Sequence, residues 1–263
     1  MPGNRPDQSG WTTPEQAAEY LRTGDGEGVK IAIIDSGVDV SHPALKGLQL
    51  ADDVAVLRYI SRFRVVEGTA KDAFGHGTAI AGIIRRIAPK AEIGSFRVLG
   101  EGLTSRSDLV AEGVRQAIYR GYHIINCSFG CRGDQNFIMS YKAWVDEAYL
   151  NGTHVIAACN NQDFSIPEWP GHFSTVITVN FTDCEEEEFF HVPGSLVGFR
   201  AKGSDVEVPW IGGGKKTVVG SSYAAPHVSG LVARILSKAP NLSPLLMKDL
   251  LHRIAKPEKD LPW

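Results

Sequence analysis

The sequence holds three side chains that can act together in nucleophilic catalysis: an alcohol, an imidazole and a carboxylate. The alcohol is Ser222, which lies between Gly220 and a segment with apolar residues at three- and four-residue spacing. This spacing predicts a helix that begins near Ser222. Unpaired backbone N–H groups and the positive end of the helix dipole can stabilise an oxyanion there. A serine at this position can also be a helix N-cap, and a nucleophile needs a base and an orienting acid.

The candidate base is His76, which lies between Gly75 and Gly77 at the predicted start of a second helix. Apolar residues at helical spacing indicate this helix: Ile80, Ile83, Ile84 and Ile87. Flanking glycines let the backbone approach a partner closely and leave the imidazole accessible. Two interpretations stay open for His76, a catalytic base and a structural histidine.

The candidate acid is Asp35, which follows a continuous apolar run from Val29 to Ile34. Such a run predicts a strand of a parallel sheet that is covered on both faces. Functional sites form at the carboxyl ends of strands in open α/β sheets, which favours a functional role for Asp35. The alternative is a carboxylate that caps a turn.

The remaining chain alternates between helical and strand patterns. We expect a helix from Pro14 to about Arg22 with Thr13 as N-cap, helices over Asp108–Arg120 and Phe137–Leu150, buried strands over Val155–Ala158 and Val176–Phe181, and short antiparallel strands within Phe189–Val219. Residues 51–73 are expected to form a loop with one strand near Ala55–Tyr59, and Pro226 to lie in the first turn of its helix. Repeated strand–helix units predict a mostly parallel sheet between helical layers.

The order Asp35, His76, Ser222 and the motifs around these residues closely resemble the subtilisin-like serine proteases, or subtilases. The motifs are strand-Asp-Ser-Gly, Gly-His-Gly-Thr-x-x-Ala-Gly and Gly-x-Ser-x-Ala-Ala-Pro-His-Val. The resemblance extends from about Trp11 to Lys256 and implies an α/β fold, a three-layer α/β/α sandwich with a mostly parallel central sheet. It also implies that Ser222 attacks a peptide carbonyl, that His76 transfers the proton and that Asp35 orients the imidazole.

The resemblance also implies an amide donor for the oxyanion. Subtilases usually have Ala-Gly-Asn after the strand that corresponds to Val155–Ala158, which aligns Asn161 with the donor and Asn160 with the glycine. A glycine position can require a positive φ, which asparagine tolerates better than most residues. We expect Asn161 to be the donor, with Asn160 as the alternative.

Substrate contacts follow from the same resemblance. An extended peptide is expected to pair with two segments, at Ser128, Phe129 and Gly130, the last residues of a strand from Ile124, and at Gly100, Gly102, Leu103 and Thr104. The pocket for the residue before the scissile bond is expected to have Ser128–Gly130 and Ala157, Ala158 and Cys159 as walls.

The floor of this pocket is expected at Glu168, directly before the pair Trp169-Pro170. A carboxylate there favours Lys or Arg in the substrate by charge pairing. The alternative is that Glu168 points to solvent from a loop.

We expect no metal and no cofactor. Many subtilases carry a calcium loop inserted in the helix after the histidine, whereas here Ile84–Pro89 continues without interruption, and His42-Pro43 is followed by Ala44 rather than an acid. The run Glu185–Glu188 is expected to be a solvated, self-repelling loop. The four cysteines are expected to be free thiols, and Cys127 and Cys131 lack a second pair at zinc spacing.

Composition excludes other classes of protein. A net charge of −3 and a pI near 6.2 give no basic face for nucleic acid or for a membrane surface. No apolar run approaches the roughly 20 residues that span a bilayer. Residues 1–10 are expected to be a flexible polar lead without a signal sequence, and residues 11–263 one catalytic domain, which favours a cytoplasmic location. The match begins near residue 11, so we expect that a folding prosegment is not encoded or has been removed.

The sequence therefore predicts a serine endopeptidase that acts on a peptide or protein substrate. Two alternatives remain: a processing peptidase or transpeptidase dedicated to one precursor peptide, and a non-catalytic peptide-binding module. A nucleotide-binding α/β domain is disfavoured, because no strand is followed by a phosphate-binding glycine loop with a lysine.

Overall fold

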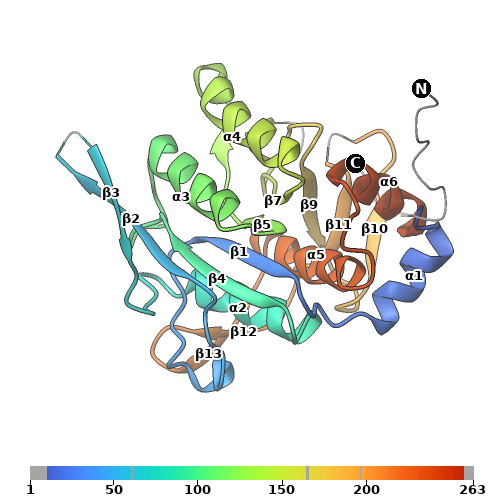
Figure 1. Ribbon diagram of the computed structural model, residues 1–263, viewed down its shortest axis with the longest axis horizontal. Helices are drawn as coiled ribbons and strands as arrows, with labels where there is room; N and C mark the ends of the chain where they lie inside the picture. Colours follow the sequence, from blue (N-terminus) through green and yellow to red (C-terminus); the bar gives the residue numbers. More distant parts are fainter. Residues whose placement is uncertain (1–10, 61, 164–165, 196, 258–263) are drawn as a thin grey trace, which may run out of the picture.

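The computed structural model describes residues 11–60, 62–163, 166–195 and 197–257, so the expected lead at residues 1–10 lies outside the described residues. A ten-stranded sheet forms the centre, in the order β14-β10-β11-β9-β7-β5-β1-β4-β2-β3 (Figure 1). Its strands are β1 (Lys30–Asp35), β2 (Asp53–Tyr59), β3 (Arg62–Glu67), β4 (Glu92–Arg97), β5 (Ile124–Cys127), β7 (His154–Ala158), β9 (Ile177–Thr182), β10 (Phe189–His191), β11 (Phe199–Lys202) and β14 (Lys256–Pro257). The seven strands from β11 to β2 in this order run parallel, which confirms the expected mostly parallel sheet.

Helices cover both faces of the sheet and make three layers (Figure 1). The helices are α1 (Pro14–Thr23), α2 (His76–Ile87), α3 (Ser107–Tyr119), α4 (Ile138–Leu150), α5 (Ser221–Leu236) and α6 (Pro244–Ile254), with short 3₁₀ turns η2 (Pro43–Leu45) and η3 (Gln135–Phe137). The bounds of α1 to α5 agree with the expected helices to within one or two residues, whereas α6 was not predicted. Thr13 caps α1 as expected, and its hydroxyl accepts the backbone N–H of Gln16.

The strand that carries the candidate acid is buried on both faces, as its continuous apolar run predicts. Ile31 and Ile33 of β1 pack into the core with α2 and α5, whereas Ala32 and Ile34 pack into the opposite core with α3 and α4. Helices α2 and α5 lie in close contact. Gly230 of α5 packs so tightly on Ile87 of α2 that a Cβ at Gly230 would overlap the Ile87 side chain. The starts of these two helices also lie together, since the rings of His76 and Tyr223 have centres 5.4 Å apart.

The strand expected near Ala55–Tyr59 is confirmed as β2, whereas the loop expected over the rest of residues 51–73 is wrong at Arg62–Glu67, which form β3. Strands β2 and β3 form an antiparallel hairpin, with register from Val54 opposite Glu67 to Tyr59 opposite Arg62. The hairpin continues the sheet and projects from its edge (Figure 1). Its outer part has both faces exposed, so the sequence shows no regular alternation of apolar and polar residues there.

The expected antiparallel strands after Phe189 are present. β10 pairs antiparallel with β11, and a separate ribbon is formed by β12 (Val206–Trp210) and β13 (Gly214–Val218). Two residues of β6 (Cys131–Arg132) pair with β8 (Glu168–Trp169), which ties the expected pocket floor to the segment after Gly130.

The acidic run Glu185–Glu188 does not form the expected self-repelling loop. Glu186 forms an ion pair with Arg86 of α2 at 2.7 Å, and Glu187 with Arg234 of α5 at 2.7 Å. Glu188 forms a further ion pair with Lys256. We refer to Glu186, Glu187 and Glu188 with these cations as the acidic clasp.

None of the four cysteines forms a disulfide, as expected, and Cys127 and Cys159 are buried. Over the described ranges, no helix combines the length and apolar character needed to cross a membrane. The same residues contain no cluster of three or more His, Cys, Asp or Glu side chains that could hold a metal ion.

Candidate active site

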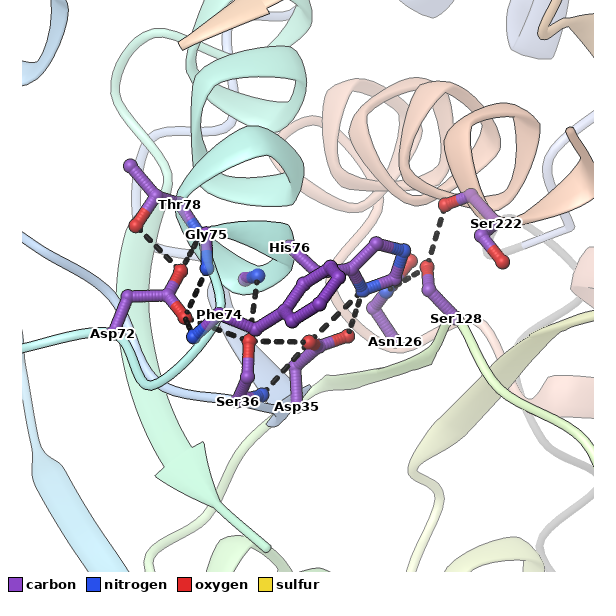
Figure 2. Close-up of polar contacts among 11 residues, drawn as sticks. Asp35, Ser36, Asp72, Phe74, Gly75, His76, Thr78, Asn126, Ser128 and Ser222 are labelled. Carbon is purple, nitrogen blue, oxygen red and sulfur yellow. Dashed lines mark hydrogen bonds and ion pairs between the residues drawn. The ribbon is translucent and has the colours of Figure 1, made fainter. Parts of the chain in front are cut away.

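The Asp35 carboxylate and the His76 imidazole form a buried hydrogen-bonded pair. Asp35 ends β1 and is fully buried, and His76 begins α2 and is 5% exposed. Both carboxylate oxygens lie 2.9 Å from Nδ1 of His76. This contact requires a proton on Nδ1, which leaves Nε2 as the free nitrogen of the neutral ring (Figure 2). The structure thus brings the predicted acid and base together.

A second buried carboxylate, Asp72, supports this pair, and the sequence interpretation missed it. Asp72 accepts the backbone N–H groups of Phe74, Gly75 and Thr78 at 2.7–2.9 Å. Asp72 lies three residues before the N-cap residue of α2, and its carboxylate accepts backbone N–H groups at the start of this helix. The signal in the sequence was an aspartate four residues before His76 and a threonine two residues after it.

Ser36 connects the two carboxylates. Its hydroxyl donates to Asp72 at 2.7 Å and lies 3.1 Å from Asp35, while its backbone N–H donates to Asp35 at 2.7 Å (Figure 2). The Asp-Ser-Gly motif thus supplies the acid together with the residue that fixes its orientation.

Two negative charges act on the His76 imidazole. Burial by itself lowers the pKa of His76, but the charge of Asp35, its hydrogen bond and the charge of Asp72 outweigh this effect. The pKa of His76 therefore lies above its ordinary value of 6.5. The ring is a stronger base than a free imidazole, as proton abstraction from an alcohol requires.

The two glycines beside His76 have separate structural roles. Gly75 has φ = 108°, a left-handed conformation in which a side chain is strained. Gly77 has no such φ, but a Cβ there would overlap the carbonyl oxygen of Gly37. The start of α2 therefore packs directly on the turn after Asp35.

Ser222 lies in the first turn of α5, directly before Tyr223, whose ring contacts the imidazole. Figure 2 shows the His76 ring between Asp35 and Ser222, and the His76 ring packs edge-on against Tyr223, with ring centres 5.4 Å apart. Ser222 is partly exposed, so a substrate can reach it. Among the described residues its hydroxyl makes no hydrogen bond, and such bonds often form only when substrate is bound.

Pro226 does not lie in the first turn of its helix, as the sequence suggested. Helix α5 begins at Ser221, so Pro226 lies in its second turn and its missing N–H leaves the carbonyl of Ser222 without a helical partner. The hydroxyl of Ser128 donates to this carbonyl at 2.8 Å. Ser128 in turn accepts from the amide of Asn126 at 2.9 Å, and Ser229 donates to the oxygen of that amide. A buried polar chain therefore holds the backbone of Ser222 in place.

The side chain of Asn161 lies beside the start of α5 in an orientation that suits an oxyanion donor. Its Oδ1 accepts the backbone N–H of Ser221 at 2.8 Å, which fixes the orientation of the amide. Among the described residues neither Nδ2 of Asn161 nor the backbone N–H of Ser222 donates a hydrogen bond, so both can donate to a ligand. Asn160 instead accepts the backbone N–H groups of Gln162 and Asp163 in a turn.

The suggested reason for Asn160 at a glycine position is wrong. Asn160 is not among the non-glycine residues with positive φ, which are Ile60, Ala70, Leu103 and Asp205. Asn160 is 8% exposed, and its side chain bonds the turn that follows, so its role here is structural.

The two expected peptide-binding segments face a common cavity, but neither is a strand. β5 ends at Cys127, so Ser128, Phe129 and Gly130 follow it without sheet pairing. The other segment is a turn, in which Leu103 N–H donates to Gly100 O at 3.0 Å and Gly100 N–H to Thr104 O at 3.2 Å. A cavity of about 540 Å³ lies between them; its lining includes Leu103, Thr104, Phe129, Gly130 and Tyr141.

The expected pocket floor and walls also come together. The carboxylate of Glu168 lies so close to Gly130 that a Cβ on this glycine would overlap it. Burial, together with the charge of Glu168, raises the pKa of the Cys159 thiol to about 12. Ala157, Ala158 and Cys159 are buried beside it at the end of β7. Glu168 is partly buried, and its carboxylate faces the wall at Gly130.

Comparisons with known proteins point to one family. A sequence model of the subtilase family matches residues 26–261. Thermitase of Thermoactinomyces vulgaris is 29% identical over 241 residues, covering 87% of this chain and 82% of thermitase. Subtilisin BL of Lederbergia lenta is 28% identical over 248 residues, covering 90% of this chain and 87% of subtilisin BL. The crystal structure of a cold-adapted subtilisin-like serine proteinase superposes with a TM-score of 0.71 at 26% identity, covering 88% of this chain and 83% of that one.

Proposed function

Because the chain belongs to the subtilase family and is a subtilisin-like serine endopeptidase, we propose that Ser222 is its nucleophile, His76 its general base and acid, and Asp35 the carboxylate that orients the imidazole. The Ser222 oxygen attacks the peptide carbonyl carbon while its proton passes to Nε2 of His76. The same proton then passes to the leaving amine as the C–N bond breaks. Water, deprotonated by His76, hydrolyses the acyl-enzyme and restores the serine.

The observation that carries this proposal is the buried pair of Asp35 and His76, whose ring contacts Tyr223 next to Ser222. A fluorophosphonate probe tests it directly, since the probe labels an activated serine. Labelling is expected in the wild type and to be absent in Ser222→Ala, whereas Ser237→Ala, at the other end of α5, keeps it. Absence of labelling in the wild type would instead favour the non-catalytic peptide-binding module.

For the oxyanion we propose a site formed by Nδ2 of Asn161 and the backbone N–H of Ser222. Both donors lie at the start of α5, where the helix dipole also favours negative charge. Their preorganisation by the Ser221 and Ser128 hydrogen bonds supports this role.

We propose that the peptide binds in extended form between Ser128–Gly130 and the turn at Gly100–Thr104. The cavity of about 540 Å³ lined by both segments supports this, since it can take an apolar side chain of the peptide. Backbone groups of the peptide supply affinity, and the pockets supply selectivity.

We further propose that Glu168 favours Lys or Arg at the residue before the scissile bond. Its carboxylate lies against Gly130 and acts on Cys159, which are the expected walls of that pocket. Matched peptides with Arg, Phe or Leu at this position test the proposal. Glu168→Gln is expected to reduce kcat/KM for the Arg peptide alone, and an equal loss for all three peptides would show that Glu168 does not select the charge.

A cytoplasmic location, a single catalytic domain over residues 11–263 and activity without calcium are also part of this proposal. Four cysteines without a disulfide among them suit a reducing compartment, and α2 runs without interruption from His76 to Ile87. Cell fractionation, limited proteolysis and activity after treatment with a chelator test the three points. Cut-site mapping in a peptide library distinguishes a general endopeptidase from one that processes a single precursor or transfers the acyl group to an amine.

A further inference from the structure

Two neighbouring cavities lined by arginine side chains lie between the turn at Gly100 and the β2–β3 hairpin. The first, of about 520 Å³, is lined by Ala73, near His76 in the chain, and by Arg97 and Gly100. The second, of about 480 Å³, continues along the hairpin. Both are bounded by Arg58, Arg106 and Leu109, so they form one groove, called here the arginine groove.

The arginine groove carries an excess of positive charge. Four arginines line it, Arg58, Arg62, Arg97 and Arg106, against two acids, Glu101 and Asp108. Asp108 is already paired, because its carboxylate lies 3.0 Å from Nε of Arg106. Within the described ranges, the one hydrogen bond of the Arg58 side chain goes to the backbone carbonyl of Ile60, at 3.4 Å. In the described part of the chain, neither Arg62 nor Arg97 has a carboxylate in ion-pair range.

Arg97 places this charge close to the catalytic residues. It ends β4, where it is in register with Asp35 of β1 on one side and Ala55 of β2 on the other. Its side chain is partly buried. A partly desolvated guanidinium without a protein carboxylate favours a carboxylate from a ligand, because the fork of N–H donors matches two carboxylate oxygens.

The outer end of the groove has the composition of a binding surface. Large apolar side chains on the hairpin are exposed, among them Tyr59 at 57%, Ile60 at 80% and Phe63 at 41%. Figure 1 shows this hairpin projecting from the sheet beside α3. Exposed apolar residues next to unpaired arginines suit a polypeptide segment that carries both apolar and acidic side chains.

We propose that the arginine groove binds acidic side chains of the substrate polypeptide on the N-terminal side of the scissile bond. The inference rests on the proposed function, since the segment Leu99–Thr104 that forms one wall of the groove is also expected to hold the residues before the cleaved bond. The overall charge of −3 does not attract acidic polymers, so selection depends on this local cluster. Peptides with Asp or Glu upstream of the cleavage position are therefore preferred over their amide counterparts.

Binding of paired peptides tests the inference. The peptides differ only by Glu or Gln at positions upstream of a mapped cleavage site, and Ser222→Ala serves as the background so that neither is cleaved. The Glu peptide is expected to bind about tenfold more tightly, as one or two charge-assisted contacts produce. Increasing ionic strength is expected to reduce this ratio.

Arginine variants locate the effect. Arg58→Gln with Arg62→Gln is expected to reduce the Glu-to-Gln affinity ratio from about tenfold to about twofold or less. Arg97→Gln is a second, independent variant with the same expected direction. The matched control is Arg64→Gln on the same hairpin, because Arg64 packs on the Tyr59 ring and lines neither cavity.

Equal affinity of the Glu and Gln peptides for the parent protein would overturn the inference. So would a Glu-to-Gln affinity ratio that Arg64→Gln reduces as much as the groove variants do. A short oligonucleotide that competes as well as the Glu peptide would also overturn it. Fluorophosphonate labelling of the same arginine variants with Ser222 intact reports separately on the catalytic residues. Loss of the proposed function therefore shows as absent labelling, whereas failure of the groove shows as an affinity ratio near one.

Discussion

At the scale of single residues, the basicity of His76 depends on two carboxylates rather than one. Asp35 touches the imidazole, whereas Asp72 lies behind it and is held by five donors from Ser36, Phe74, Gly75 and Thr78. Asp72 is thus a positioning residue, since it orients the start of α2 and adds negative charge near His76.

We expect Asp72→Asn to move the pH dependence of the reaction. The base must be neutral, so kcat/KM rises with pH through the pKa of His76, which lies above 6.5. Loss of one negative charge lowers this pKa and shifts the ascending limb to lower pH. The pH–rate profile measures the shift, and Asp249→Asn, whose carboxylate pairs with Arg253 on α6, is the matched control. If Asp72→Asn lowers kcat/KM without shifting the ascending limb of the pH–rate profile, then Asp72 acts only as a helix cap and does not raise the pKa of His76.

Asn161 permits a second prediction at this scale. Asn161→Ala removes the proposed side-chain donor but leaves the backbone N–H of Ser222, so we expect kcat to fall by roughly 10²- to 10³-fold with little change in KM. Steady-state kinetics measure this split. Asn160→Ala is expected to act mainly on stability, since Asn160 bonds the turn that follows. A normal kcat for Asn161→Ala would exclude this donor.

At the scale of elements, the position of Ser222 depends on a missing hydrogen bond in its own helix. Pro226 has no N–H to donate to the carbonyl of Ser222. The hydroxyl of Ser128, in the segment after β5, donates to this carbonyl instead. A helix start is thereby attached to a neighbouring segment that also forms part of the proposed peptide site.

Ser128→Ala is expected to leave the Ser222 carbonyl without its buried donor, which costs about 1–3 kcal/mol of stability. We also expect a lower kcat, because the nucleophile loses its fixed position. The double variant Ser128→Ala/Pro226→Ala restores a helical N–H and should recover part of the loss in thermal stability. Thermal unfolding and kcat are the measurements, and no recovery in the double variant would contradict this account of the helix start.

At the scale of the whole molecule, the acidic clasp connects elements that carry different candidate catalytic residues. Arg86 belongs to the helix of His76, and Arg234 and His227 to the helix of Ser222. Glu186 lies 3.9 Å from Nε2 of the buried His227, which is in ion-pair range but beyond hydrogen-bond distance. The contact with His227, opposed by burial and assisted by Arg86, lowers the pKa of Glu186 to about 2.

This clasp makes stability depend on pH in acid. A carboxylate with a lowered pKa stabilises the fold above its unfolded pKa of about 4.5 and loses this contribution as the pH falls toward about 2. We expect the melting temperature of the wild type to fall over this pH range. Glu186→Gln is expected to have a lower melting temperature at neutral pH and a smaller change of melting temperature in acid. The exposed Glu185→Gln is the control. An identical acid profile in Glu186→Gln and the wild type would show that the clasp does not contribute.

The sequence by itself determined five of the helices, several buried strands, the mostly parallel sheet between helical layers and the candidate residues. These depend on local patterns: Ile31–Ile34 show a buried strand, the isoleucines after His76 show one apolar helix face, and Gly75 and Gly77 mark a backbone that must adopt a positive φ or approach another segment. These patterns are visible in the sequence because each helix or strand buries its own apolar face, whichever element it packs against.

Only the tertiary structure decided which distant side chains meet. Three such contacts depend on how closely separate elements pack, and no periodic pattern in the sequence predicts them. They join Asp72 to Ser36, Ser128 to the carbonyl of Ser222, and Glu186 to its cationic partners. Strand β3, and with it the hairpin, was missed for a related reason: both faces of the outer hairpin are exposed, so burial leaves no pattern along it. Its arginines become a groove only because β2 lies beside β4 and the turn at Gly100.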